Sequence, residues 1–236
     1  LSMNIAISYS YNSFLQNDYL ERELANQGHQ VFFVGAPAGG RAGYNQRSRM
    51  GELLGNLPAA PDVFLCIDPS DRTFPVGVEE LDIPTVCWLG DIHLGTWRQE
   101  VAKFFDLLFL PHADYLASYR QVVGHQQVEW LPLYVSPHVQ PLVGAERIYE
   151  VGFVGNIASA HRTTARARRI KLLRTTFHTN DLAHYYSHDE LGTVYSQSKI
   201  VFNNTINGDL NLRLFEGTAC GALVLTDSVA NGLEQC

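Results

Sequence analysis

Residues 207–221 contain the densest group of side chains that could bind a ligand. Gly208 and Asp209 predict a turn and a helix N-cap, and the free amides and partial positive charge of a helix start suit a phosphate group. Arg213 would hold the same anion through paired hydrogen bonds. Glu216, one turn further along, would accept hydrogen bonds from paired hydroxyls such as those of a ribose. The alternative is an ion pair between Arg213 and Glu216 on a solvated helix.

A glycine turn and a basic segment form a second candidate ligand site. Asn156 follows an expected strand at 150–155, and residues 162–174 carry six of the chain's 17 basic residues, beginning with Arg162. Positive charge gathered in an acidic chain favours a local polyanion, and a diphosphate fits it better than a nucleic acid duplex. Only the first of these basic residues would reach a ligand at the strand end, and the later ones indicate a solvated helix face.

Asp91 and His93 form a third candidate site, directly after an expected strand at 84–89. Catalytic groups commonly emerge at such strand ends, and a carboxylate beside an imidazole can act as a base or as an orienting pair. The alternative is that Asp91 caps the next helix and His93 forms a local hydrogen bond.

Elements that would position these residues alternate along the whole chain, as is typical of parallel α/β sheets. The expected strands are 3–8, 30–35, 63–67, 84–89, 107–110, 150–155, 199–203 and 222–226. The expected helices are 19–25, 50–54, 97–105, 113–123, 163–177 and 211–220. Residues 131–150 are rich in proline and lack periodicity, which indicates a linker between two Rossmann-like domains.

Composition narrows the class of protein. The 236 residues are 46% hydrophobic and 17% charged, as in globular proteins, and the formal net charge of −7 argues against binding nucleic acid. No apolar run approaches the roughly 18 residues of a membrane span, so no integral membrane segment is expected. The four cysteines lie far apart, without metal-site spacing, and indicate reduced thiols in a cytoplasmic protein.

Residues 195–227 resemble the donor-binding half of GT-B glycosyltransferases, and especially the CgeB-like group, which is related to the retaining family of glycogen and sucrose synthases. The turn at 153–156, followed by Arg162, and the stretch 88–93 are similar to other blocks of that group. The resemblance implies an α/β protein with two Rossmann-like domains that face a cleft. It implies an incomplete C-terminal domain, because only nine residues follow Asp227.

The resemblance also implies that the two domains bind different substrates. Residues 1–140 would bind the acceptor, a glycan, a protein or a small molecule, with Ser10 and Tyr11 in the first turn after a strand as contacts. Residues 141–236 would bind a nucleotide-diphosphate sugar as the donor substrate. The reaction would be a hexosyl transfer with retention, without a metal or a separate cofactor.

Donor contacts follow residue by residue from the same resemblance. Glu216 matches the second glutamate of the family's paired-glutamate motif, which binds the ribose. The first glutamate falls at Gly208, so Asp209 or Asn211 would contact the sugar hydroxyls instead. Asn156 is a further donor-binding candidate.

Arg162 and Arg213 would stabilise the leaving diphosphate. In this family, basic side chains of this kind take the place of a metal ion. In a retaining reaction the leaving phosphate would itself deprotonate the acceptor, whereas inversion would need Asp91 or His93 as a base. Two alternatives share the fold: a nucleotide-sugar 2-epimerase, and a nucleotide-sugar or glycan-binding module without turnover.

Overall fold

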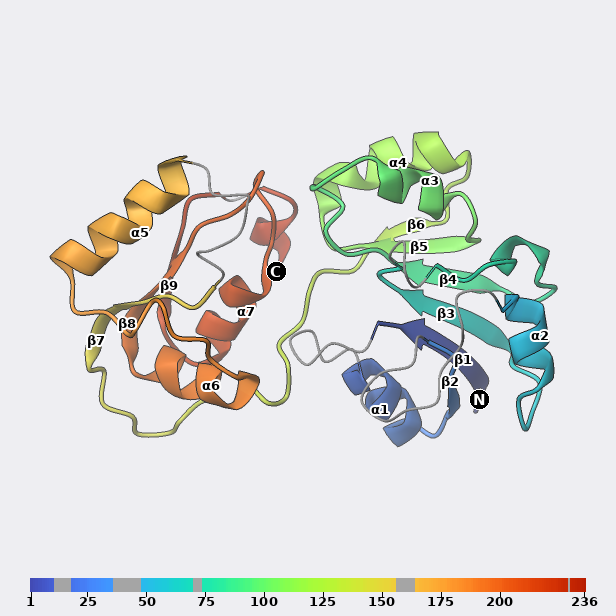
Figure 1. Ribbon diagram of the computed structural model, residues 1–236, viewed down its shortest axis with the longest axis horizontal. Helices are drawn as coiled ribbons and strands as arrows, with labels where there is room; N and C mark the ends of the chain where they lie inside the picture. The colour runs from blue at the N-terminus through green and yellow to red at the C-terminus, as the bar shows by residue number, and fades with distance from the viewer. Residues whose placement is uncertain (11–17, 36–47, 70–73, 156–163, 229) are drawn as a thin grey trace. The chain divides into compact units, whose positions relative to one another are not determined.

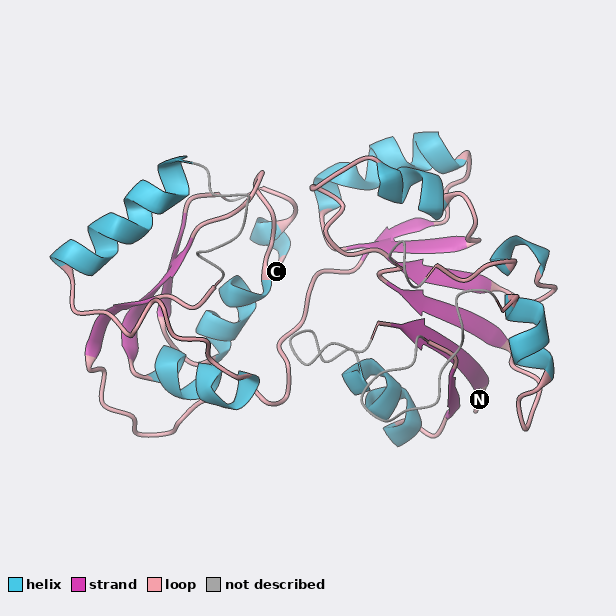
Figure 2. Cartoon of the chain, in the orientation of Figure 1, coloured by secondary structure: helices cyan, strands magenta, loops and turns pink. Residues whose placement is uncertain are grey.

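The computed structural model describes residues 1–10, 18–35, 48–69, 74–155, 164–228 and 230–236. The chain divides into two compact units, Leu1–Pro132 (unit 1) and Leu133–Cys236 (unit 2). Both are α/β units with a parallel sheet, as the sequence predicts (Figure 1, Figure 2). No helix in the described part of the chain has the length and apolar character needed to cross a membrane.

Unit 1 is built on a parallel sheet with the strand order β2-β1-β3-β4-β5-β6. Its strands are β1 (Asn4–Tyr9), β2 (Gln30–Phe33), β3 (Val63–Ile67), β4 (Thr85–Trp88), β5 (Leu107–Leu110) and β6 (Val128–Trp130). The chain runs outward from β1 to β2 and then returns to β3 on the other side of β1. In open α/β sheets such a switch point opens a crevice at the carboxyl ends of the strands, where ligands bind.

Among the described residues, the α-helices between these strands are α1 (Asp18–Asn26), α2 (Met50–Gly55), α3 (Trp97–Ala102) and α4 (Leu116–Val123). Figure 1 shows α1 beside β1 and β2, and α3 and α4 together beside β5 and β6. Phe64, Cys87 and Leu108 from the sheet are fully buried against Met50 of α2 and Tyr119 of α4. The apolar strand residues thus find their core on the helices that the alternating pattern predicts.

Unit 2 has a smaller parallel sheet with the order β7-β8-β9. Its strands are β7 (Tyr149–Gly152), β8 (Ser198–Asn203) and β9 (Leu223–Thr226), and its helices are α5 (Thr164–Thr176), α6 (His188–Ser196) and α7 (Leu212–Ala219). Helices α6 and α7 cover one face of the sheet and pack around Val201. Helix α5 covers the other face, where Ile170 and Leu173 pack against Val151 and Phe153 (Figure 1).

The proline-rich segment before β7 is packed onto unit 2 and is not a free linker. Val139 is only 2% exposed and belongs to the same core as Tyr195 of α6. The backbone N–H of Leu142 donates to Oγ of Ser196 at 2.8 Å. Arg147 donates to main-chain carbonyls of Tyr195 (3.0 Å), Ser198 (2.8 Å), Cys220 (3.4 Å) and Gly221 (2.9 Å). One side chain therefore joins the last turn of α6, the start of β8 and the two residues that follow α7.

Candidate functional site

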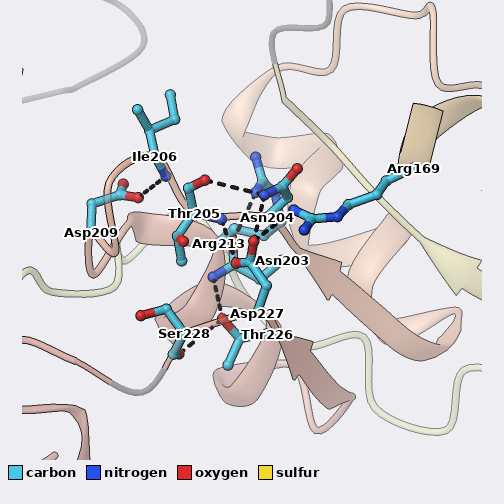
Figure 3. A network of polar contacts seen from close by, with 10 residues as sticks. All are labelled: Arg169, Asn203, Asn204, Thr205, Ile206, Asp209, Arg213, Thr226, Asp227 and Ser228. Atoms are coloured by element: carbon cyan, nitrogen blue, oxygen red, sulfur yellow. Dashed lines mark hydrogen bonds and ion pairs between the residues drawn. The ribbon is translucent and has the colours of Figure 1, made fainter. Parts of the chain in front are cut away.

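The candidate donor site lies in unit 2, where the carboxyl ends of the parallel strands meet the start of α7. β8 ends at Asn203 and β9 at Thr226, while the chain leaves β7 through residues 153–155. Carboxyl ends of parallel strands share one edge of a sheet, so these ends and the first turn of α7 form one polar region (Figure 3).

Arg213 in the first turn of α7 is bound to both neighbouring strands. Its Nε donates to the carbonyl of Val154 at 2.7 Å, and its Nη1 donates to Oδ1 of Asn203 at 2.9 Å. Its guanidinium carbon also lies 4.4 Å from the ring centroid of Phe153, a cation–π contact. These contacts fix α7 against the ends of β7 and β8, so the edge of the guanidinium that carries Nε and Nη1 faces the protein.

The remaining nitrogen of Arg213, Nη2, lies at the glycine turn that follows β7. A Cβ atom on Gly155 would come within 2.2 Å of this nitrogen, so any other residue would displace the guanidinium. The sequence predicts that Arg213 donates two hydrogen bonds to an anion. In the structure, only the Nη2 side of its guanidinium is left for such a contact. The arginine serves first to position the helix.

Glu216 is buried in the second turn of α7, three residues after Arg213. The residue is only 5% exposed, and this burial raises the pKa of its carboxyl group from 4.5 to about 7. The positive charge of Arg213 and a hydrogen bond with Tyr195 oppose this rise in pKa. A solvated ion pair, the alternative from the sequence, is wrong because Glu216 is shielded from water.

Asp209 does not cap α7, contrary to the expectation from the sequence. Its carboxylate accepts a hydrogen bond from the backbone N–H of Ile206 and closes the preceding turn. The N-cap position belongs to Asn211, which has an extended backbone (φ −93°, ψ 164°). Within the described part of the chain, Oδ1 of Asn211 is buried without a hydrogen-bond partner. A polar acceptor is thus left open where the helix amides begin.

A carboxylate that the sequence did not single out, Asp227, organises the other side of this region (Figure 3). Its Oδ2 accepts hydrogen bonds from Nη1 of Arg169 at 2.8 Å and from Nδ2 of Asn204 at 2.7 Å. Its Oδ1 accepts from the backbone N–H of Thr205 at 2.8 Å. Arg169, expected on a solvated face, is therefore half of an ion pair at the sheet edge.

Arg166 of α5 belongs to the same polar region. Burial lowers the pKa of its guanidinium, as does the nearby positive charge of Arg213, while Asp209 and Asp227 oppose that change in pKa. Its guanidinium carbon lies 5.7 Å from the ring centroid of Phe153. Helices α5 and α7 thus bring guanidinium groups to one strand edge. Asn156 and Arg162, two further candidates from the sequence, lie outside the described residues.

In unit 1, the structure separates the predicted partners Asp91 and His93. Asp91 is exposed, with φ at 46°, and its carbonyl accepts from the N–H of Leu94 at 3.0 Å. His93 is 9% exposed, and its Nδ1 lies 3.2 Å from Nε2 of His112. Burial and the neighbouring His93 lower the pKa of His112 to about 4, so this buried imidazole stays neutral at physiological pH.

One of the two acceptor candidates from the sequence lies at the end of β1. Ser10 directly follows that strand and is half-buried, whereas Tyr11 lies outside the described residues. Sequence analysis missed Asp68, which follows β3 and lies near Asp91. The signal available was a carboxylate directly after the expected strand at 63–67, where ligand-binding groups commonly emerge. In the described part of the chain, His, Cys, Asp and Glu side chains form no group of three or more that could hold a metal.

Residues 155–236 match the family model described as glycosyl transferase-like. Among solved structures, sucrose-phosphate synthase from Thermosynechococcus elongatus superposes with a TM-score of 0.60 at 12% identity, covering 99% of this chain and 83% of that one. A DNA-modifying β-glucosyltransferase, studied with and without uridine diphosphoglucose, gives a TM-score of 0.57 at 14% identity, covering 95% and 79%. No curated protein matches the chain.

The two structural matches extend over nearly the whole chain and show the GT-B fold. The family match coincides with the segment that contains α7 and the strand ends around it. It confirms the resemblance to CgeB-like glycosyltransferases on which the sequence analysis relied. Residues 155–236 therefore resemble the glycosyl transferase-like family, within a chain of GT-B fold.

Proposed function

We propose that the protein transfers a hexosyl group from a nucleotide-diphosphate sugar, bound by unit 2, to an acceptor bound by unit 1. The observation that carries this proposal is the buried carboxylate of Glu216, held beside Arg213 at the strand edge of a glycosyl transferase-like domain. The fold match to a glucosyltransferase studied with uridine diphosphoglucose supports a nucleotide-sugar donor.

Glu216 is the proposed ribose contact. An ionised carboxylate can accept a hydrogen bond from each of two adjacent hydroxyls, and such charge-assisted bonds are strong where water is excluded. Tyr195 and Arg213 hold the carboxyl in place and favour its ionised form. Hydroxyl donors from a ribose would favour that form further, so we expect nucleotide binding to release a proton near neutral pH.

The diphosphate would lie at the start of α7, against backbone amides of residues 211–213. Arg166 and the Nη2 side of Arg213 would supply positive charge, joined by Arg162 and Asn156 from the adjoining segment. The open Oδ1 of Asn211 would accept a hydroxyl of the donor sugar. Asp209 is a less favourable sugar contact because its carboxylate already closes a turn.

In the transfer, the bond between the sugar's anomeric carbon and the diphosphate oxygen breaks, and that oxygen keeps the electron pair. A bond forms between the anomeric carbon and the acceptor oxygen, whose proton passes to a base. In the retaining course that we propose, the leaving phosphate takes that proton, so no metal and no protein base is required. An inverting course would instead use the exposed Asp91, since His93 is nearly buried.

Acceptor binding would involve Ser10 and Tyr11 after β1. The acceptor is a glycan, a protein or a small molecule. The four cysteines are free thiols, which supports a reducing, cytoplasmic setting for the reaction.

Calorimetric titration with UDP, GDP, ADP and dTDP tests the donor site. One of these nucleotides is expected to bind, and Glu216→Ala should weaken its binding about 10- to 100-fold, the cost of losing charge-assisted hydrogen bonds. Glu146→Ala, which removes an exposed carboxylate from the same unit, is the matched control. Failure of all four nucleotides to bind would overturn the proposal.

Incubation with a panel of sugar nucleotides tests turnover. Release of free sugar and nucleoside diphosphate, or transfer to an added acceptor, is the expected outcome. Isomerised sugar nucleotide without release would identify a 2-epimerase instead. Tight binding with no change in the sugar nucleotide under any acceptor would identify a binding module.

A further inference from the structure

An ion pair between α5 and the end of β9 lies beside the proposed donor site. Nη1 of Arg169 donates to Oδ2 of Asp227 at 2.8 Å, and the two side chains are 46% and 25% exposed. Figure 3 shows the arginine reaching from its helix to the carboxylate. α5 also rests on the sheet through the apolar side chains of Ile170 and Leu173. Apolar packing is not directional, so the ion pair helps to fix the rotation of this helix at the carboxyl edge.

The carboxylate of Asp227 is itself held in one orientation. Its Oδ2 also accepts from Nδ2 of Asn204 at 2.7 Å, and its Oδ1 accepts from the backbone N–H of Thr205 at 2.8 Å. Asn204 is buried, and its Nδ2 donates in addition to the carbonyl of Thr205 at 3.1 Å. Because the loop after β8 donates to both carboxylate oxygens, Arg169 binds an acceptor whose direction is already fixed.

Arg166 lies one turn before Arg169 on the same side of α5. Helix positions three residues apart differ by about 60° in rotation and about 4.5 Å in height. The guanidinium carbon of Arg166 lies 5.7 Å from the ring centroid of Phe153, and that of Arg213 lies 4.4 Å from the same centroid. A rotation of α5 that broke its ion pair with Asp227 would therefore also move Arg166 away from this ring.

The two guanidinium groups near Phe153 repel each other. Burial lowers the pKa of Arg166, and the positive charge of Arg213 lowers it further, whereas Asp209 and Asp227 raise it. Before an anion binds, this repulsion favours a rotation of α5 that separates Arg166 from Arg213. A contact that opposes such a rotation keeps both cations in place for a diphosphate, so the site need not rearrange on binding.

We propose that Arg169 and Asp227 are positioning residues of the donor site. Their ion pair holds Arg166 beside Arg213 and so determines how strongly the site prefers a nucleoside diphosphate to the monophosphate, without contact between the pair and the donor. This inference rests on the proposed transferase function, in which the diphosphate lies at Arg166 and Arg213. A half-exposed ion pair contributes little to global stability, so its effect should appear in binding rather than in unfolding.

Calorimetric titration of the full chain with UDP and UMP tests this role, with ADP and AMP, GDP and GMP, or dTDP and dTMP used instead where that base binds more tightly. In Arg169→Met, the ratio of diphosphate to monophosphate affinity should fall about 3- to 10-fold, because the second phosphate loses one of its two positioned cations. Arg169→Lys keeps a cation that reaches Asp227 and should restore most of the ratio.

Matched variants separate positioning from a general loss of charge or of structure. Arg168→Met removes the same charge from the neighbouring exposed residue, which forms no ion pair among the described residues. It should leave the ratio within about twofold of wild type, because salt screens exposed charges. Asp227→Asn already breaks the pair, so adding Arg169→Met to it should lower the ratio no further. The urea unfolding midpoint of Arg169→Met should stay near that of wild type.

The outcomes distinguish this inference from the donor proposal. The positioning role alone is wrong if the wild-type chain binds nucleotide and Arg169→Met keeps the wild-type ratio, if Arg168→Met lowers the ratio as much, or if Arg169→Lys restores none of it. A large loss of stability in Arg169→Met would assign the pair a structural role instead. If no nucleotide binds the wild-type chain, the donor proposal fails and the positioning role fails with it.

Discussion

Arg213 and Asn203 join the first turn of α7 to the carboxyl end of β8 through a 2.9 Å hydrogen bond between Nη1 and Oδ1. The same arginine holds the carbonyl of Val154 after β7. A residue whose type suggests a ligand contact is thus used to set the position of the helix. This side chain therefore helps to position the backbone amides of α7 and the carboxyl group of Glu216 at the sheet edge.

Replacing Arg213 is expected to loosen α7 before it affects any ligand. Arg213→Lys loses the fork that reaches both Val154 and Asn203, and a double-mutant cycle with Asn203→Ala should give a coupling free energy of about 1–2 kcal/mol. Hydrogen exchange of the α7 amides provides the measurement. Arg174→Lys, on an exposed position of α5, is the control. Additive effects of the two substitutions would show that the bond contributes nothing.

The raised pKa of Glu216 predicts that stability falls as the pH rises. The folded protein binds this proton up to a pH of about 7, whereas the unfolded chain releases it near 4.5, so the contribution is complete below 4.5 and is lost as the pH rises through 7. Glu216→Gln, a neutral mimic, should therefore gain about 1–3 kcal/mol over wild type at pH 8 and little at pH 5. Urea unfolding followed by circular dichroism at both pH values measures this. Equal gains at both pH values would refute the burial argument.

The lowered pKa of His112 predicts that the stability of unit 1 rises with pH, opposite to the effect of Glu216. Its pKa falls from 6.5 to about 4 on folding, so the stabilising effect is complete above 6.5 and is lost as the pH falls towards 4, by up to about 3 kcal/mol. His112→Gln should flatten this part of the profile, while His29→Gln should not. All three tryptophans, Trp88, Trp97 and Trp130, lie in unit 1, so their fluorescence reports the unfolding of that unit. An unchanged acid profile in His112→Gln would contradict the prediction.

Arg147 is expected to be among the costliest single residues to remove from unit 2. Arg147→Ala leaves four main-chain carbonyls without this donor and should lower the free energy of unfolding by about 2–4 kcal/mol. Arg147→Lys keeps the charge but cannot span all four carbonyls, so an intermediate loss is expected. Urea unfolding followed by far-ultraviolet circular dichroism compares the variants. Equal stability of wild type and Arg147→Ala would show that water replaces the arginine at no cost.

Strands were the most predictable part of the fold, because each expected run was apolar and bounded by turn residues. β6 was missed, since Val128–Trp130 is too short to show a period. Helix α6 was missed although Ser187 and Glu190 form a capping box. In this motif, the side chain of each residue accepts a hydrogen bond from the backbone N–H of the other. That spacing was present in the sequence and marks a helix start.

Side-chain partners at the candidate sites could not be predicted, because they come from residues far apart in sequence. Asn203 and Val154 can both accept hydrogen bonds from Arg213 only when β7 and β8 are side by side. His112 meets His93 only because β4 and β5 are neighbours. Sequence position gave the strand end on which each residue lies, and the folded sheet decided which atoms remained for a ligand.

The packing of residues 133–148 onto unit 2 has a practical consequence for dividing the chain into fragments. A fragment that began at β7 would lack Val139, leaving a hole in the core around Tyr195, and would lack the guanidinium of Arg147. Chimeras that exchange unit 2 between related proteins face the same constraint, since their crossover must fall near Pro132 to carry this segment along with the sheet it completes.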